Sequence, residues 1–384
     1  MKRFLLLIFF LSIVSFQNFS FAEESNERVI KSNRIDNYEI LSISQPGSLF
    51  YSVTNGIIKS AINLNSNLTF IGRANVGLEK VIDKNNIEIL TTRKDYLYSL
   101  SIKTIHNDVS DLFYSKEVSE SLINNEIIIS DLTANLYSLT KGDSMFLIGL
   151  NQQEVEVVVG EIIPDSEIGW FEGVVNKDLG YKLGINRNIQ AIIWGNKITE
   201  NHLIEIHKNI KYKKIRITGR DSSPNRNWVL PTALVKEMFG DFQIKERDGT
   251  WITIDRAWKD ENIETKNVPI LGRITCHRLM WEPLLGAFNQ IIEENLQSGL
   301  SREQYQEAGG CYAPRRINRF DSGGSISRHA WGIAIDINTK TGYKPRIVEI
   351  FNDWGFAWGG TWTSPDAMHF ELRSLSASIS QANK

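Results

Sequence analysis

The sequence predicts an α+β protein in which a β-rich N-terminal region precedes a smaller C-terminal domain of helices and short strands. Short β-branched runs separated by Gly, Asn and Asp dominate residues 23–212. The composition changes near Gly219, and seven of the ten Trp lie from Trp251 onward. Two amphipathic helical patterns, with a short alternating segment between them, then indicate a mixed C-terminal domain.

Length and composition are those of an ordinary globular chain. It has 384 residues, of which 42% are hydrophobic and 23% charged, with 43 Lys and Arg against 45 Asp and Glu. These proportions exclude a collagen-like, coiled-coil or mainly disordered protein and suit two or three domains. The balanced charge argues against a nucleic-acid partner, because there is no basic excess to neutralise phosphates.

The first residues predict a secretory signal peptide. Lys2 and Arg3 precede an apolar run that ends near Phe16, and Ser20-Phe21-Ala22 places small residues before a cleavage site. The run is short for a membrane span, which needs about 20 residues. We therefore expect cleavage after Ala22, no transmembrane span in the mature chain, and a secreted or periplasmic location in the cell envelope.

Composition also predicts the domain boundaries. We expect a signal peptide at 1–22, a β-rich N-terminal domain at 23–218, a turn-rich linker at 219–231, a C-terminal α+β domain at 232–374 and a tail at 375–384.

The N-terminal domain should contain several short strands and few helices. Strands are predicted at Glu126–Ser130, Glu154–Val159 and Gln190–Trp194. Asp131–Leu139 reads as a short helix with Asp131 as its N-cap. We find no catalytic constellation in this region of the sequence.

The segment Ile127–Ile163 resembles the extracytoplasmic domain of FtsX/MacB-type permeases, in which a strand and a short helix precede Gly-Asp and further strands. Lys141-Gly142-Asp143 matches that Gly-Asp. The resemblance implies a partner in the cell envelope. A β-rich spacer or binding module is the interpretation that we favour for this region.

The C-terminal domain shows clear helix and turn signals. Pro231 and Gly240 bracket a predicted helix, and Asp248-Gly249 predicts a hairpin turn. The hairpin strands are Phe242–Lys245 and Trp251–Ile254, further helices are Trp281–Leu296 and Pro345–Trp354, and Trp331–Asn338 and Met368–Leu372 read as strands.

The chain has two cysteines, Cys276 and Cys311, which lie 35 residues apart. In an oxidising compartment they can form one disulfide, worth roughly 3–4 kcal/mol in the loop-entropy picture. Two buried thiols are the alternative. A cysteine zinc site is disfavoured because no C-x-x-C pair occurs.

Two segments near the C-terminus carry candidate chemistry. They read Ser327-Arg-His329-Ala-Trp-Gly332-Ile-Ala334-Ile-Asp336 and Asp366-Ala-Met-His369-Phe-Glu371. Two His and one Asp can hold Zn²⁺ and leave a fourth position for water. The gap from His329 to Asp336 is odd, so a regular strand would direct these side chains to opposite faces, and Gly332 is the residue that could break the strand.

These motifs resemble the zinc D-alanyl-D-alanine carboxypeptidases and L-alanyl-D-glutamate endopeptidases that cut peptidoglycan stem peptides. That family has the pattern S-x-H-x2-G-x-A-x-D followed by [ED]-x-x-H, and every fixed position is present here. The resemblance extends over roughly Thr232 to Arg373. It implies the fold of the Hedgehog and DD-peptidase domains, with a small antiparallel sheet and flanking helices.

The resemblance also implies a role for each motif residue. The zinc ligands would be His329, Asp336 and His369, and Asp366 would be the catalytic base. An Arg before the first motif contacts the substrate in this family; Arg315 and Arg316 are the candidates, of which we favour Arg315 for catalysis.

Three residues in or near the motifs keep two interpretations each, and a fourth residue, His277, has one. Ser327 could hold substrate or cap the turn that carries His329, and Glu371 could orient a ligand histidine or simply pair on its strand. Trp362 could line the substrate cleft or pack in the core, while His277 has no partner at metal-ligand spacing and favours a structural role.

The function predicted from the sequence is therefore a secreted zinc metallopeptidase of D-alanyl-D-alanine carboxypeptidase type, acting on peptidoglycan stem peptides. An endopeptidase of the same family, or a non-catalytic module that binds the cell wall with zinc as a structural staple, are the alternatives. Serine-type catalysis is disfavoured because the G-x-S-x-G motif is absent.

Overall fold

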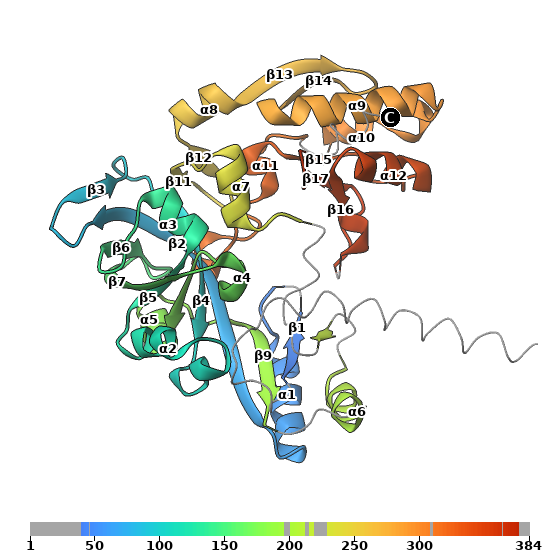
Figure 1. Ribbon diagram of the computed structural model, residues 1–384. Coiled ribbons are helices and arrows are strands. Elements are labelled where there is room, and N and C mark those ends of the chain that lie inside the picture. The colour runs from blue at the N-terminus through green and yellow to red at the C-terminus, as the bar shows by residue number, and fades with distance from the viewer. Residues whose placement is uncertain are drawn as a thin grey trace, which may run out of the picture.

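The computed structural model describes residues 40–45, 47–195, 200–211, 215–218, 229–307, 310–362 and 364–375. The predicted signal peptide, most of the predicted linker and nearly all of the tail lie outside these residues. Figure 1 shows the N-terminal region in blue to green and the C-terminal region in yellow to red, in contact with each other. None of the helices in the described part of the chain has the length and hydrophobicity needed to cross a bilayer.

The N-terminal region is built around a ring of strands. The pairing runs β2–β4–β8–β5–β7–β6, and a further pairing of β2 with β6 closes it. These strands are β2 Asn67–Ile82, β4 Tyr98–Ile105, β5 Ile127–Ser130, β6 Ser144–Ile148, β7 Glu154–Ile163 and β8 Gly173–Asn176. Closure leaves fewer unpaired strand edges, which are the usual sites of unwanted association.

Alternating apolar residues fill the interior of the ring. Along β2, Ala74, Val76 and Leu78 are buried at every second position and belong to one core cluster with Ile127 and Ile129 of β5. Successive residues of a strand point to opposite faces, and the intervening Asn75 and Gly77 are buried as well, so both faces of this part of β2 are covered. The β-rich character predicted for this region is confirmed.

The remaining N-terminal elements extend or cover the ring. β9 pairs with β2, β1 with β9 and β10 with β1, while β3 pairs with the far end of β2. Their bounds, with those of the helices, are β1 Leu41–Ser44, α1 Tyr51–Asn63, β3 Glu88–Thr91, α2 Lys116–Ile123, α3 Asp131–Tyr137, α4 Asp165–Ile168, α5 Lys177–Lys182, β9 Asn188–Trp194, α6 Glu200–Asn209 and β10 Arg216–Thr218.

Helix α3 confirms the predicted short helix, but the predicted N-cap is wrong. Ser130 is the cap, and its hydroxyl accepts a hydrogen bond from the backbone N–H of Thr133 at 3.2 Å. Asp131 is the first helical residue, and its carboxylate accepts from the N–H groups of Leu132 and Asp165. The two residues are both good caps, so sequence alone misplaced the start by one position.

The C-terminal region places helices against short two- and three-stranded sheets. Its elements are α7 Thr232–Phe239, β11 Ile244–Glu246, β12 Ile252–Ile254, α8 Arg256–Asn262, β13 Ile263–Val268, β14 Gly272–His277, α9 Trp281–Glu293, α10 Arg302–Glu307, α11 Arg328–Trp331, β15 Ala334–Asp336, α12 Pro345–Asp353, β16 Phe356–Trp358 and β17 His369–Leu372. The predicted hairpin is β11–β12. The predicted small antiparallel sheet is present as β15–β17–β16.

One predicted strand in this region starts too early. Trp331 was expected to open a strand that runs to Asn338, yet it ends helix α11, and the strand begins only at Ala334. Apolar residues alternate along the sequence near Trp331 because the chain is buried both before and after the turn at Gly332. This pattern looks like that of a strand, so hydrophobic period alone cannot tell the two apart.

The predicted disulfide is confirmed. Cys276 of β14 and Cys311 are bonded, with their Cα atoms 5.4 Å apart. The bridge fixes the segment before Arg315 to the β13–β14 hairpin, within the main apolar core of the C-terminal region.

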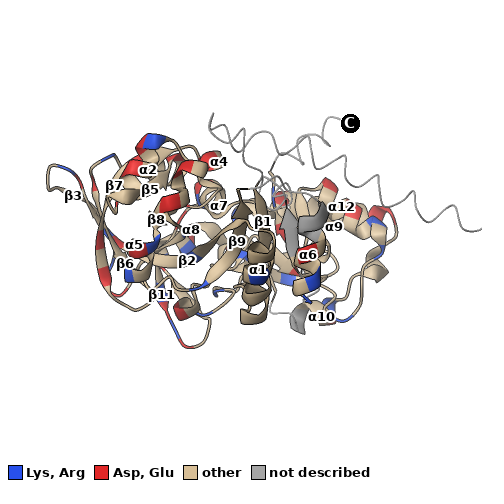
Figure 2. Ribbon diagram, turned by 90° about the horizontal axis from the view of Figure 1, so that it is seen from below, with Lys and Arg blue, Asp and Glu red and all other residues tan. Residues whose placement is uncertain are grey.

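The two regions share a buried polar contact. Lys236 of α7 lies with its ammonium 2.7 Å from Glu172 and 3.3 Å from Asp241, and it donates to the carbonyl of Ser99 at 2.6 Å. Helix α7 also packs beside α3 in Figure 1. Since Glu172 and Ser99 belong to the N-terminal region, the contact couples the two folding units directly. Acidic and basic segments are interspersed over both regions (Figure 2).

Candidate metal centre

His329 is positioned by a very short helix. Ser327 caps α11, and its hydroxyl accepts from the backbone N–H of His329 at 3.3 Å. Gly332 then ends the helix with φ of +69°, and a Cβ there would lie 2.7 Å from the backbone N of His277. Glycine is needed both for the left-handed conformation and for this close approach. The turn brings the chain into β15, as predicted.

Asp336 and His369 are cross-strand neighbours. In the antiparallel pairing of β15 with β17, Asp336 lies opposite His369 and Ala334 lies opposite Glu371. Directly opposed residues on one face of an antiparallel pair have their Cβ atoms about 5 Å apart. The register of two short strands therefore brings two of the predicted ligands together.

The three side chains converge. Asp336 has one carboxylate oxygen 2.9 Å from His369 Nδ1 and the other 3.2 Å from His329 Nε2. The two imidazole nitrogens are 3.3 Å apart. One ligand atom from each residue lies within 4.8 Å of the others, and all three side chains are buried.

The cluster has strongly perturbed protonation. Burial would raise the pKa of Asp336, but hydrogen bonds from His329 and His369 outweigh it and hold that pKa well below its usual range. Burial would lower the pKa of His369, yet Asp336 and Glu371 together raise it to about 9. The hydrogen bonds from both imidazoles therefore keep the Asp336 carboxylate ionised.

Each imidazole is held by its other nitrogen. His329 Nδ1 lies 3.0 Å from the carbonyl oxygen of Cys311, and His369 Nε2 lies 3.2 Å from Glu371. Such partners fix the ring orientation of metal-binding histidines. The disulfide thus anchors the backbone group that orients His329.

The donor set fits zinc. Two imidazoles and one carboxylate are the protein ligands of catalytic zinc sites, in which a fourth position binds water or substrate. The arrangement of His329, Asp336 and His369 matches this set in chemistry and in burial.

A comparison with known families agrees with the motifs. Residues 321–372 match the family model for D-alanyl-D-alanine carboxypeptidase. The matched segment contains the three candidate ligands and both motifs. No curated protein matches the chain. The match supports the resemblance to these carboxypeptidases and, with the His/Asp/His cluster, a metallopeptidase of zinc type.

The residue assigned as base in the carboxypeptidase pattern lies beside the cluster. Asp366 is half-buried, its N–H donates to the carbonyl of Gly359 at 3.0 Å, and its own carbonyl accepts from the N–H of His369 at 3.2 Å. This turn sets Asp366 directly before the ligand His369. A Cβ on Gly359 would lie 2.6 Å from the carbonyl oxygen of Asp366, so a side chain there would displace the turn.

Trp362 covers one side of the cluster. Its ring lies 5.2 Å from the ring of His369 and is partly exposed. The indole therefore borders the space next to the ligand histidine. That Trp362 lines a substrate cleft stays a prediction.

The two candidate arginines lie differently. Arg316 is buried and donates to Glu246 through Nε at 2.9 Å and Nη2 at 2.8 Å, with Nη1 on the carbonyl of Gly324 at 2.6 Å. These contacts occupy its whole guanidinium in the fold. Arg315 is half-buried, and its carbonyl accepts from the N–H of Ser327. The substrate role of Arg315 stays a prediction, whereas the guanidinium of Arg316 is engaged with Glu246 and Gly324.

Other predicted residues take structural positions. His277 lies 3.2 Å from the carbonyl of Phe239, and burial lowers its pKa to about 4. Ser327 acts as a helix cap, and Glu371 contacts a ligand imidazole.

Sequence reasoning missed the backbone carbonyl of Cys311, which contacts His329. It also missed the phenol of Tyr343, which donates to the carbonyls of Ile337 and Met368, the residues next to Asp336 and His369. Neither belongs to a motif, so no sequence signal marked them.

Proposed function

We propose that this chain is a secreted zinc metallopeptidase that hydrolyses peptide bonds in peptidoglycan stem peptides, as a D-alanyl-D-alanine carboxypeptidase. The convergence of His329, Asp336 and His369 carries the proposal, because it gathers a catalytic zinc set exactly where the family match lies. The same match supports the Hedgehog and DD-peptidase fold for the C-terminal domain.

Zinc would be held by the two imidazoles and the Asp336 carboxylate. When bound, it would supply Lewis acidity and a nucleophile at neutral pH. Asp336 remains ionised for this task because two imidazoles hold its pKa low. Glu371 and the Cys311 carbonyl keep the two rings in their binding orientation.

Asp366 is assigned the proton transfers. Its carboxylate accepts a proton from the attacking water and returns it to the leaving amine, as a general base and then a general acid. The turn to His369 fixes its backbone next to the ligand strand. Arg315 would donate to the substrate carbonyl or carboxylate through its planar guanidinium.

The central test compares three proteins on one substrate. The full chain, Asp366→Ala and the control His106→Ala are incubated with a stem pentapeptide ending in D-alanyl-D-alanine, and products are weighed by mass spectrometry. We expect loss of one terminal alanine with the full chain and the control, since His106 is an exposed residue paired with Asp108. Asp366→Ala should retain about one zinc per chain and lose cleavage by about 10²–10⁴-fold.

The products separate the alternatives. Cleavage between L-alanine and D-glutamate would assign the chain to the endopeptidases of the family. Binding of intact peptide without any cleavage would favour the wall-binding module. Full activity of Asp366→Ala would remove the assigned base.

The role of the N-terminal region is a separate proposal. It follows from the predicted resemblance of Ile127–Ile163 to a permease domain, and the strand–helix–strand order of β5, α3 and β6 is compatible with it. Co-purification of envelope proteins with the full chain, lost on substitution of exposed residues of α2 or α5, would support an envelope partner.

A further inference from the structure

A second candidate site lies between the N-terminal region and the loop that leads to the metal centre. The cavity has a volume of about 1010 Å³. Its N-terminal lining comes from residues 44–54, from Lys103 and from residues 169–171 and 186–190, and its C-terminal lining comes from residues 317–318 and 322–325. No family assignment covers this combined surface.

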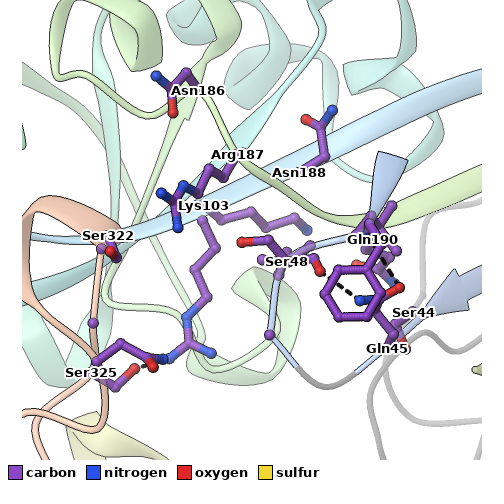
Figure 3. A pocket seen from close by; sticks show the side chains of 18 of the residues that line it. Ser44, Gln45, Ser48, Lys103, Asn186, Arg187, Asn188, Gln190, Ser322 and Ser325 are labelled. Atoms are coloured by element: carbon purple, nitrogen blue, oxygen red, sulfur yellow. Dashed lines mark hydrogen bonds between the residues drawn. The ribbon is translucent and has the colours of Figure 1, made fainter. Parts of the chain in front are cut away.

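The cavity is positively charged. Arg73, Lys103 and Arg187 line it, and the described lining residues include no Asp or Glu. Figure 3 shows Lys103 and Arg187 between Ser322 and Ser325 on one side and Ser44, Gln45 and Gln190 on the other. Convergent cations without lining carboxylates favour an anionic ligand.

Arg73, one of the three cations, contacts the loop at Ser325. It donates to the hydroxyl of Ser325 at 2.9 Å and lies over the ring of Phe171 at 5.5 Å, so both contacts are with neutral groups. Burial first and then Arg328 lower its pKa from the usual value, and Glu172 offsets part of that effect. An anion in the cavity would offset part of the cost of burying this charge.

Helix α1 adds to the positive potential. Its N-terminal residues Phe50, Tyr51 and Thr54 line the cavity, its N-cap has no side-chain hydrogen bond, and its first turn has no acidic residue. The positive end of a 13-residue helix therefore meets the cavity, where the N–H of Phe50 already donates to Oε1 of Gln45 at 3.2 Å.

The rest of the lining suits a sugar. Ser48 and Asn186 supply donors and acceptors, as Figure 3 shows. The amide of Gln45 bonds to Ser48 and Phe50, whereas that of Asn188 accepts from Lys177. Phe50, Tyr51 and Ile317 are exposed by 51%, 83% and 59% although they are apolar or aromatic. The exposed rings of Phe50 and Tyr51 can pack against the apolar face of a sugar ring, and the neighbouring polar groups can bond to its hydroxyls.

The cavity is a built feature of the interdomain contact. The N–H of Asn75 on β2 donates to the carbonyl of Gly323 at 3.3 Å, and a Cβ on Gly323 would lie 2.9 Å from the Cβ of Ala74. Gly323 has φ of +71°, so this residue both turns the loop and lets it approach the strand. Arg316 holds the other side of the loop at Gly324.

We propose that this cavity binds an anionic sugar, with Arg187, Arg73 and Lys103 around the charged group and the aromatic rim against the ring. The proposal does not depend on peptidase activity, because binding is measured in a protein whose metal centre is disabled.

The test measures binding by calorimetry in the full chain carrying His369→Ala. N-Acetylmuramic acid supplies a sugar with a carboxylate, N-acetylglucosamine supplies a matched sugar without it, and inorganic phosphate supplies an anion without a sugar. We expect the carboxylated sugar to bind at least tenfold more tightly than either. Its affinity should fall as salt rises from 50 to 500 mM, since partly exposed charges are screened.

Variants locate the site. Arg187 is exposed, so Arg187→Ala should fold normally and weaken binding of the carboxylated sugar about tenfold, and Arg187→Lys should recover part of it. Arg247→Ala removes the same charge from an exposed position outside the lining and should bind as the parent does. Equal affinity for the neutral sugar, equal affinity for phosphate, no binding of the carboxylated sugar at 10 mM, or an unaffected Arg187→Ala would each overturn the proposal.

Discussion

Two buried polar clusters in this molecule differ in where their cation comes from. Between the two regions, the ammonium of Lys236 lies among Glu172, Asp241, the carbonyl of Ser99 and the hydroxyl of Tyr137. In the C-terminal domain, two imidazoles and one carboxylate converge without a lysine or arginine among them.

The difference separates a structural cluster from an exchangeable one. Lys236 is tethered to α7, so its charge satisfies two carboxylates for as long as the chain is folded. At Asp336 the positive charge comes from protonated His369, whose pKa is about 9. A metal ion that binds this imidazole displaces its proton. Both clusters are buried, yet the Lys236 cluster stabilises the fold and the His329, Asp336 and His369 cluster is suited to bind a metal.

Metal removal should have the largest effect. His369→Ala, or a chelator on the parent, should abolish zinc binding and lower peptide cleavage by about 10³-fold or more, because the metal contributes several kcal/mol to the transition state. Zinc content by mass spectrometry and cleavage of the stem pentapeptide measure both effects. Cleavage that persists after complete chelation would contradict the assignment of this cluster as a catalytic metal site.

Substitution of Lys236 should have the next largest effect, on folding rather than activity. Lys236→Met leaves Glu172 buried without its cation, which typically costs 3–5 kcal/mol. Urea denaturation of zinc-loaded protein measures the loss. Lys236→Met with Glu172→Gln should recover part of it, whereas the exposed control Lys259→Met should change stability by under about 0.5 kcal/mol. A single variant as stable as the parent would show that this contact does not join the regions.

The sequence predicted one cluster and missed the other for a physical reason. His329, Asp336 and His369 belong to fixed motifs, since metal chemistry restricts both residue type and spacing. Lys236 and Glu172 lie in unrelated segments of ordinary composition, and only the docking of α7 on the ring brings them together. Ion pairs between distant segments leave no periodic signal.

The fold was predictable to a similar extent. Strands β5, β7 and β9 and helices α9 and α12 follow from local patterns and lie near their predicted bounds. Closure of the ring through β2 and β6 depends on pairing between distant segments, which patterns do not encode. The family resemblance rested on the motifs, and the comparison that matches residues 321–372 covers those same residues.

Zinc binding should release a proton. At pH 7 the metal-free protein keeps His369 protonated, because its pKa of about 9 lies above the solution pH, and coordination requires the neutral ring. Calorimetric titration with zinc in buffers of different ionisation enthalpy should show release of about one proton, and zinc affinity should increase with pH up to about 9. Glu371→Gln should lower zinc affinity about 10–100-fold. Zinc binding that is independent of pH between 6 and 9 would contradict this account.

The smallest expected effect concerns the pair formed by the buried Asp165 and the exposed Asp131. Burial first, and then the hydrogen bond with Asp131, raise the pKa of Asp165 to about 7. The buried Oδ1 of Asp165 also has no hydrogen-bond partner within the described residues. A folded-state pKa above the unfolded value of about 3.9 means that this stabilisation is complete below pH 4 and lost as pH rises through 7.

Asp165→Asn should remove this pH-dependent loss of stability. It keeps a side-chain oxygen to accept the hydrogen bond that the N–H of Leu132 donates to Asp165 at 3.1 Å. We expect the parent to lose on the order of 1 kcal/mol relative to this variant between pH 5 and pH 8. His369 titrates in both proteins, so the difference in their urea midpoints isolates the acid pair. The exposed control Asp111→Asn should follow the parent at every pH, and a parallel pH profile for Asp165→Asn would mean that the pair stays fully ionised. Two ionised carboxylates would then lie side by side, unlike the Lys236 cluster, in which the ammonium matches the charge of Glu172 and Asp241.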